Sequence, residues 1–447
     1  MVAAKLVLII CCMHSTASLS PLYPNGKMIR RQSNPSHMSG STKATNNYYY
    51  EDDDNANPDL VGVHVDGYPL PPTPSRPDDA ELLARLQSIQ GKTLFREASS
   101  GGTTAKHEYE RRALTRKQRP LRVLVAGGGL GGLATASALL RKGCDVHVLE
   151  QAVQYKPFGG PIQLQSNALW ALNQIAPELY EAVRQCGVQT GDRLSGIKDG
   201  MRYAEGWLVK FDAATPARKK GLPLTLAINR VVLQDIFLKY GVPPERIHTN
   251  ARVMSYNATD SYKSGVTVVL EDGRQIYGDI LVGADGIWSR IRHQICELPQ
   301  EEVGIRYADK HASYSGYTCF TGTCQHTPED IKDVAYKVFL GQQQYLGCTD
   351  AGHGWQHLWA FLPDAPSLGA LPTDVDGKKM LGRLQREFAG WSPEIHDLFN
   401  ATKPEVVRQR DLFDRKPMWN GWLDKNGANV VLLGGTSHTV PATCDVA

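Results

Sequence analysis

A glycine-rich turn between two apolar segments constrains the fold of this chain more than any other feature. The residues from Leu121 to Glu150 read LRVLVAGGGLGGLATASALLRKGCDVHVLE, which predicts a strand buried on both faces, a turn, a helix and a second strand. Gly127, Gly129 and Gly132 fit the spacing G-x-G-x-x-G. In that motif the first glycine makes the turn, the second lets backbone approach a pyrophosphate, and the third lets helix pack on strand. The segment therefore predicts a unit that binds a dinucleotide.

The same unit offers a contact to each part of such a ligand. The helix after the turn would direct unpaired N–H groups and its positive dipole end at the phosphates. Glu150 ends the second strand, where its carboxylate can accept the hydrogen bonds of a ribose diol. The candidate contacts of this unit are Gly127, Gly128, Gly129, Leu130, Gly131, Gly132 and Glu150.

A second strand, turn and helix lie far downstream, in GDILVGADGIWSRIR from Gly278 to Arg292. An apolar strand over 280–282 leads to a turn that contains Asp285 and Gly286. Taken alone, this pattern also fits an ordinary connection in which an Asp caps the following helix.

In this order, the two motifs resemble the class A FAD-dependent monooxygenases of the para-hydroxybenzoate hydroxylase fold. In that family the Asp-Gly segment contacts FAD and helps to handle the nicotinamide reductant. The resemblance therefore implies that Asp285, Gly286 and Arg292 belong to the cofactor site. It also implies an α/β fold in which a Rossmann-like FAD-binding domain is interleaved with a β-sheet substrate domain.

Further segments extend the resemblance to the zeaxanthin epoxidases, the carotenoid-epoxidising branch of that family. They are GGPIQLQSNALWAL at 159–172, FDAATPARKKGLPLTLAINRVVLQ at 211–234, YSGYTCFTGTC at 314–324, KVFLGQQQYL at 337–346 and RQRDLFDRKP at 408–417. The likeness covers residues 121–441, the expected monooxygenase domain, and adds Gln163 and Arg230 to the candidate cofactor residues.

The chain departs from the family near its end. These monooxygenases carry a late strand that ends in Gly-Asp and leads to a glycine-rich helix start, but here Gly435 stands where the Asp belongs. Gly434, Ser437 and Pro441 keep positions of the family's motif, and residues 442–447 are atypical. We expect this end to reflect a truncation or a shifted reading frame, and the flavin half of the site to be impaired.

The N-terminal segment predicts targeting. Lys5 precedes an apolar run over 6–12, which is too short to span a bilayer, and small residues at 16–18 offer a cleavage site. Because residues 19–50 lack Asp and Glu, we expect a signal peptide over 1–18 followed by a transit peptide-like segment over 19–50. Such a presequence is similar to that of algae whose plastids lie inside extra membranes. Secretion is the alternative.

Residues 51–120 predict a mostly disordered linker, because an acidic run, a proline-rich run and a Ser-Gly run cannot form a core. A short amphipathic helix over 78–90 would pack on the catalytic domain or dock elsewhere. The net charge of +3 and the scattered cysteines give no argument for nucleic acid or a metal.

A strand-like, aromatic segment over about 307–363 predicts the substrate sheet. Its aromatic residues are Tyr314, Tyr317, Phe320, Tyr336, Phe339, Tyr345, Trp359 and Phe361. We expect most of them to serve the core, because a sheet of this size needs apolar packing. A sheet of this composition beside a flavin would suit a long apolar substrate.

The resemblance implies that reduced FAD reacts with dioxygen to give a flavin hydroperoxide, whose distal oxygen epoxidises a carotenoid such as zeaxanthin. NAD(P)H or another donor would supply the electrons, and the catalytic side chains remain unknown. We expect dioxygen and an apolar carotenoid as partners, peripheral contact with a membrane, and neither nucleic acid nor metal. An aromatic-ring hydroxylase of the same fold, or a non-catalytic relic that no longer holds FAD, is the alternative.

Overall fold

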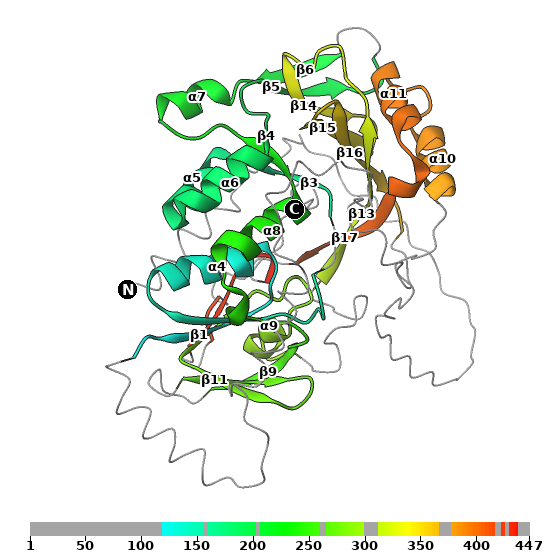
Figure 1. The fold of residues 1–447 in the computed structure, drawn as a ribbon. Coiled ribbons are helices and arrows are strands. Elements are labelled where there is room, and N and C mark those ends of the chain that lie inside the picture. The colour runs from blue at the N-terminus through cyan, green and yellow to red at the C-terminus, as the bar shows by residue number, and fades with distance from the viewer. Residues whose placement is uncertain are drawn as a thin grey trace, which may run out of the picture.

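The computed structural model describes residues 119–155, 159–202, 206–258, 265–298, 312–365, 377–415, 422–424 and 429–436. They form two interleaved parts, one built on a parallel sheet and one on a larger mixed sheet (Figure 1). The predicted α/β class is therefore confirmed. The predicted presequence, nearly all of the linker with its helix, the C-terminal end, Ser437 and Pro441 lie outside the described residues.

The parallel sheet has the strand order β18-β12-β1-β2-β8, with β1 at its centre. The strands are β1 (Arg122–Ala126), β2 (Asp145–Leu149), β8 (Ile247–His248), β12 (Ile280–Gly283) and β18 (Val430–Leu432). Val123 and Val125 join one buried hydrophobic cluster, whereas Leu124 and Ala126 join another. Since successive side chains of a strand point to opposite faces, β1 is buried on both faces, as predicted.

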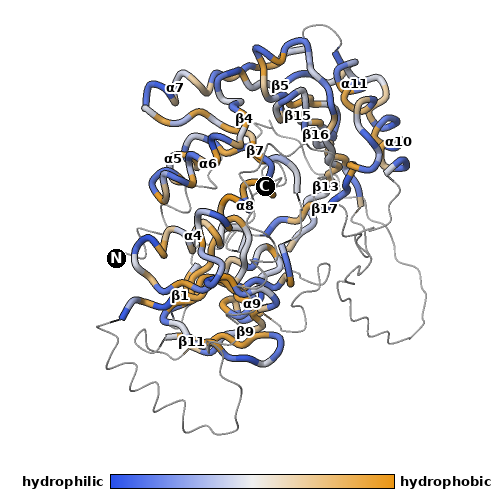
Figure 2. Tube along the Cα trace, viewed as in Figure 1, coloured by the Kyte–Doolittle hydropathy of each residue, from blue (hydrophilic) through white to orange (hydrophobic). Residues whose placement is uncertain are grey.

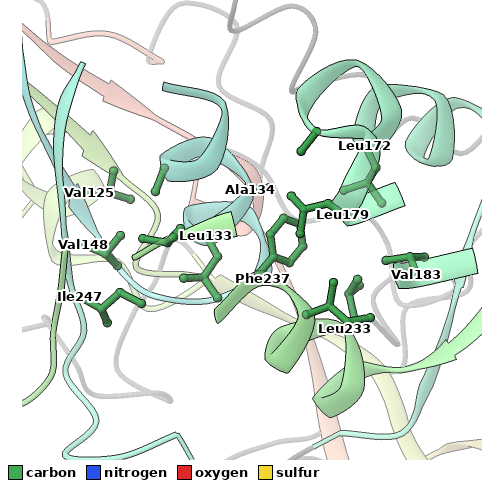
Figure 3. Close-up of a cluster of buried hydrophobic side chains, with 14 of the residues drawn as sticks. Val125, Leu133, Ala134, Val148, Leu172, Leu179, Val183, Leu233, Phe237 and Ile247 are labelled. Carbon is green, nitrogen blue, oxygen red and sulfur yellow. The ribbon is translucent and has the colours of Figure 1, made fainter. Parts of the chain in front are cut away.

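Helices cover one face of the parallel sheet. They are α4 (Leu130–Arg141), α5 (Ser166–Ile175), α6 (Pro177–Cys186) and α8 (Arg230–Ile236), which a π-helical turn (Phe237–Gly241) extends. In Figure 3, Leu133 of α4 lies between Val148 of the sheet and Phe237. The hydrophobic segments gather around β1 and its neighbours (Figure 2), so this packing is the core of the first part.

The other face is covered by three antiparallel strands and a short helix. These are β9 (Val253–Ala258), β10 (Val266–Leu270), β11 (Gln275–Gly278) and α9 (Arg290–Ile295). β10 and β11 form a hairpin whose turn contains Asp272 and Gly273, a pair typical of such turns. Gly273 has a φ of +80°, which glycine tolerates best.

The large sheet has the order β17-β13-β16-β15-β14-β5-β6. Its strands are β5 (Leu194–Asp199), β6 (Trp207–Phe211), β13 (Ala312–Gln325), β14 (Val334–Leu340), β15 (Tyr345–Gly352), β16 (Trp355–Pro363) and β17 (Arg408–Arg415). α10 (Gly377–Glu387) and α11 (Pro393–Ala401) pack on one of its faces. The sheet thus extends beyond the predicted 307–363, because β5, β6 and β17 come from distant segments.

Short elements connect the two sheets. β3 (Pro161–Leu164), β7 (Leu226–Asn229) and β4 (Val188–Gln189) form a small sheet between them, and α7 (Ala214–Lys219) follows β6. Single 3₁₀ turns lie at Pro244–Arg246, Pro404–Val406 and Gly434–Thr436. Within the described part of the chain, no helix has the length and apolar character needed to cross a bilayer.

Two histidines meet in the parallel sheet where β2 pairs with β8. Nδ1 of His147 lies 3.0 Å from Nε2 of His248, and burial lowers the pKa of each ring to about 4. Histidines of an unfolded chain titrate near 6.5. Both rings are therefore neutral in the folded protein at pH values where the unfolded chain already binds protons.

This difference predicts that the protein loses stability as the pH falls from about 6.5 towards 4, while stability above that range is insensitive to these rings. Within this range, each ring lowers the free energy of unfolding by about 1.4 kcal/mol for every unit by which the pH falls. Urea unfolding at pH 7.5 and pH 5 measures the loss, and His248→Gln should show a smaller one. An equal loss in the variant would contradict this account.

Candidate functional site

The glycine turn follows β1 directly, and the protein's own packing requires two of its glycines. Gly127 has a φ of +110°, and a Cβ there would lie 2.3 Å from the carbonyl oxygen of Ala284. A Cβ on Gly132 would lie 2.0 Å from the carbonyl oxygen of Gly127. A Cβ on Gly129, by contrast, would meet no described atom within 4 Å. The backbone at Gly129 is thus open to a ligand, whereas the other two positions are closed.

The same turn leads into α4 without a side-chain cap. Gly129 is the N-cap residue, it makes no side-chain hydrogen bond, and the first turn of α4 holds no acidic residue. The first N–H groups of a helix need an acceptor. An anionic group beside Gly129 would accept these hydrogen bonds and face the positive end of the helix dipole.

Glu150 and Tyr155 flank Gly128. Oε2 of Glu150 accepts a hydrogen bond from N of Gly128 at 2.6 Å, and Oε1 accepts one from N of Ala152 at 2.9 Å. The hydroxyl of Tyr155 is buried without a hydrogen-bond partner among the described residues, and it lies against Gly128. Burial and the charge of Glu150 raise the pKa of Tyr155. Sequence reasoning missed Tyr155 because it belongs to no motif.

Asp285 lies in the turn after β12, and only one of its two carboxylate oxygens has a hydrogen-bond partner among the described residues. Its Oδ2 accepts hydrogen bonds from N of Arg290 at 2.9 Å and from N of Ile291 at 3.3 Å. This carboxylate therefore binds the first N–H groups of α9, although the N-cap residue of that helix is Ser289 and not an Asp. Its Oδ1 is buried and has no partner among the described residues. Burial raises the pKa of Asp285. A hydroxyl or N–H group of a ligand would satisfy Oδ1.

The Gly434–Thr436 turn, which follows β18, contacts the turn that contains Asp285 and Gly286. N of Gly286 donates to Oγ1 of Thr436 at 2.8 Å, and Nη1 of Arg292 donates to the carbonyl oxygen of Thr436 at 3.2 Å. Arg292 and the fully buried Thr436 therefore join the two predicted motifs. Sequence reasoning missed Thr436. At Gly435 a Cβ would meet no described atom within 4 Å, so the turn has room for the side chain that the family carries.

Gln163 and Arg230 lie at the junction of the small and large sheets. Nε2 of Gln163 donates to Oγ1 of Thr349 on β15 at 2.9 Å. Arg230 begins α8 beside Gly159, where a Cβ would lie 2.8 Å from Cδ of the arginine. Burial lowers the pKa of Arg230. The structure thus joins Gln163 to the large sheet and places Arg230 against Gly159, just before β3.

A buried histidine that sequence reasoning missed lies at this junction. Nε2 of His357 lies 2.7 Å from Oγ1 of Thr321, and its Nδ1 has no partner among the described residues. A Cβ on Gly160 would lie 2.6 Å from Nε2, so β3 approaches the ring closely. Burial lowers the pKa of His357 to about 3, and the ring is neutral. The only signal in the sequence is a polar residue within an apolar strand.

The face of the large sheet opposite α10 and α11 is aromatic and only partly covered. Tyr317, Tyr345 and Trp359 pack on a small cluster that contains Phe361, and the rings of Tyr345 and Phe361 stack at 4.2 Å. Of the eight aromatic residues named above, the buried ones are Phe320, Phe339 and Phe361. Because Phe320 and Phe339 lie in the cluster under α10 and α11, and Tyr317, Tyr345 and Trp359 pack against the cluster of Phe361, six of the eight contribute to an apolar core, in line with the expectation that most would.

The described residues hold no group of three or more His, Cys, Asp or Glu that could bind a metal ion. Three features lie together at the carboxyl end of the parallel sheet: the glycine turn after β1, the buried Oδ1 of Asp285 after β12, and the Gly434–Thr436 turn after β18. Ligands of open α/β sheets bind at this end.

No model of a protein family matches the chain. The zeaxanthin epoxidase of Prunus armeniaca is 38% identical over 380 residues, which is 83% of this chain and 53% of the relative. The enzyme of Oryza sativa subsp. japonica is 41% identical over 330 residues, 72% of this chain and 46% of the relative. The chain thus spans about half the length of the curated relatives it matches.

Among solved structures, Klebsiella pneumoniae HpxO complexed with FAD and uric acid aligns with a TM-score of 0.59 and 23% identity, covering 72% of this chain and 74% of that one. At 23% sequence identity, this structural similarity is evidence for a shared fold and for no shared function. The chain is therefore a homologue of the zeaxanthin epoxidases, and it shares the fold of HpxO, which was solved with FAD bound.

Proposed function

We propose that this chain is an FAD-dependent monooxygenase that forms an epoxide on an apolar alkene such as a carotenoid. The observation that carries the proposal is the meeting of the glycine turn, Asp285 and the Gly434–Thr436 turn at one end of the parallel sheet. The zeaxanthin epoxidase relatives favour a carotenoid substrate over the aromatic acids of other enzymes with this fold.

The residues present fit the parts of FAD. The open backbone at Gly129 and the uncapped start of α4 suit the pyrophosphate, and Glu150 suits the adenosine ribose. Oδ1 of Asp285, which is buried without a described partner, suits a hydroxyl of the cofactor. Gln163 and Arg230 would lie towards the flavin ring, and Gly434, Ser437 and Pro441 would complete the site by resemblance.

Bound FAD would supply the activation of dioxygen, with two electrons from NAD(P)H or another donor. One oxygen atom enters the alkene and the other leaves as water. The chain's own residues then need to hold the alkene and exclude water. The partly exposed rings of Tyr336, Tyr345 and Trp359 offer an apolar surface for this purpose. The neutral ring of His357 can make one further hydrogen bond at Nδ1 without a change of charge.

We also propose a plastid location, because the relatives are named as chloroplastic, and the signal-plus-transit presequence fits delivery to such an organelle. Contact with a membrane would bring the protein to a substrate that dissolves in lipid.

Product analysis tests the proposed reaction directly. The full chain, FAD and a chemical or enzymatic reductant are incubated with zeaxanthin under ¹⁸O₂, and the products are analysed by chromatography and mass spectrometry. We expect one ¹⁸O atom per epoxide formed and no product from a small phenolic acid. Hydroxylation of the phenolic acid alone would instead support the aromatic hydroxylase, and a chain that binds no FAD would support the relic.

Gly435→Asp should strengthen FAD binding. The position has room for the side chain, and a charged hydrogen bond contributes about 1.5 to 3 kcal/mol, or one to two decades in affinity. Quenching of FAD fluorescence measures the dissociation constant. Gly435→Asn is the matched control, because it adds a similar shape without the charge and should gain less. Unchanged affinity in the Asp variant would contradict the assignment of this turn to the flavin site.

A further inference from the structure

A cluster of charged side chains lies at the end of the parallel sheet opposite to the glycine turn. Arg122 and Asp145 are the first residues of β1 and β2 and pair across these strands, and Arg246 directly precedes β8. Because the glycine turn follows the other end of β1, roughly 16 Å separates this cluster from the proposed FAD site. The cluster surrounds a cavity of about 310 Å³, which we name the amino-end cavity. Its lining residues are Arg119, Pro120, Arg122, Cys144, Asp145 and Arg246.

Two guanidinium groups of the amino-end cavity share one carboxylate. Nε of Arg122 donates to Oδ2 of Asp145 at 2.8 Å, and Nη1 of Arg246 donates to Oδ1 of the same side chain. Nη1 and Nη2 of Arg122, and Nε and Nη2 of Arg246, have no hydrogen-bond partner among the described residues. Both arginine side chains are about a third exposed, at 30% and 33%. Their remaining N–H groups are therefore available to a ligand in the cavity.

The third arginine of the cavity is already paired within the protein. Nη1 and Nη2 of Arg119 donate to the two carboxylate oxygens of Asp279, at 2.8 and 3.0 Å. Asp279 is fully buried and also accepts a hydrogen bond from N of Arg122 at 2.8 Å. This carboxylate therefore balances the charge of Arg119 and leaves Asp145 to balance the other two arginines.

The amino-end cavity thus carries an excess of positive charge. Nε2 of His147 lies 3.2 Å from Oδ1 of Asp145, but burial lowers the pKa of the ring to about 4, so the ring is neutral at pH 7. Burial raises the pKa of the Cys144 thiol, which is also neutral. Three arginines against the two carboxylates Asp145 and Asp279 leave a net charge of +1 on these groups. An anion would meet an attractive field there.

A phosphate group matches this arrangement. A guanidinium presents a planar fork of N–H groups that binds phosphate oxygens in pairs, and one phosphate has enough oxygens for two such forks. A water molecule takes about 30 Å³ in the liquid, so the cavity has room for a phosphate and for a small group attached to it. The ion pairs with Asp145 explain how the starts of β1, β2 and β8 are held together, but not the guanidinium nitrogens that have no partner.

We propose that the amino-end cavity binds a phosphate group, as inorganic phosphate or as a small soluble phosphate ester. Arg122 and Arg246 donate to the phosphate oxygens, while Asp145 orients both guanidinium groups and competes with the phosphate for them. This site shares no residue with the proposed FAD site. Its failure would therefore leave the proposed reaction untouched, and failure of the reaction would leave this site untouched.

Isothermal titration calorimetry of the full chain tests the site, with inorganic phosphate and with glycerol 3-phosphate at constant ionic strength. We expect one site per chain, and Arg122→Gln and Arg246→Gln should each weaken binding about tenfold. Asp145→Asn should strengthen it, because the amide keeps the shape of the side chain and removes the competing charge. Phosphate should also raise the melting temperature of the unaltered chain. Tighter binding of either probe supports the proposal and identifies the form of phosphate that the cavity prefers.

A matched control changes an arginine elsewhere. Arg383 on α10 is 34% exposed and pairs with Asp364 at 2.7 Å, so Arg383→Gln removes a similar ion pair and should bind phosphate as the unaltered chain does. Binding should also persist with FAD in excess, since FAD would occupy the glycine turn. Displacement by FAD, equal binding in the Arg122→Gln and unaltered chains, or weaker binding in Asp145→Asn would overturn the proposal. No heat of binding, with a lower melting temperature in all three cavity variants, would show that these ion pairs serve stability alone.

Discussion

The close approach of the glycine turn to its neighbours is the constraint on which the rest of the structure depends. Gly127 packs against the carbonyl of Ala284, and Gly132 packs against the carbonyl of Gly127. Both contacts are so close that a Cβ atom on either glycine would overlap the carbonyl oxygen. These contacts bring β1, α4 and β12 together at a single point. Since β1 is buried on both faces, the two hydrophobic clusters of the first part form around the same strand. The position of the candidate site follows from that packing.

The carboxylates that the sequence singles out for a ligand also hold the loops in place. Glu150 accepts hydrogen bonds from N of Gly128 and N of Ala152, and Asp285 accepts them from the first residues of α9. Burying a carboxylate costs free energy unless it accepts hydrogen bonds, so these backbone N–H groups stabilise both side chains in the folded protein. Ligand binding at this corner would therefore add to an existing network, with Oδ1 of Asp285 as the atom that still needs a partner.

Local motifs predicted the first part of the structure well, because a buried strand, a glycine turn and an Asp-Gly segment each have a signature within a few residues. The hairpin at Asp272-Gly273 is of the same kind. Tyr155, His357 and Thr436 could not be predicted, since their importance comes from burial against segments distant in sequence. The pairing of β5 with β14 is equally non-local, which is why the substrate sheet is wider than the sequence indicated.

Binding of FAD by Gly129→Val tests the central claim most directly. A Cβ at Gly129 meets no described atom within 4 Å, and its φ of −68° is ordinary for any residue, so the variant should fold with an unchanged melting temperature. If the pyrophosphate lies against this backbone, the valine side chain occupies its place. The account predicts that fluorescence titration detects FAD binding to the unaltered chain and none to the variant. Equal affinity in both proteins would contradict it.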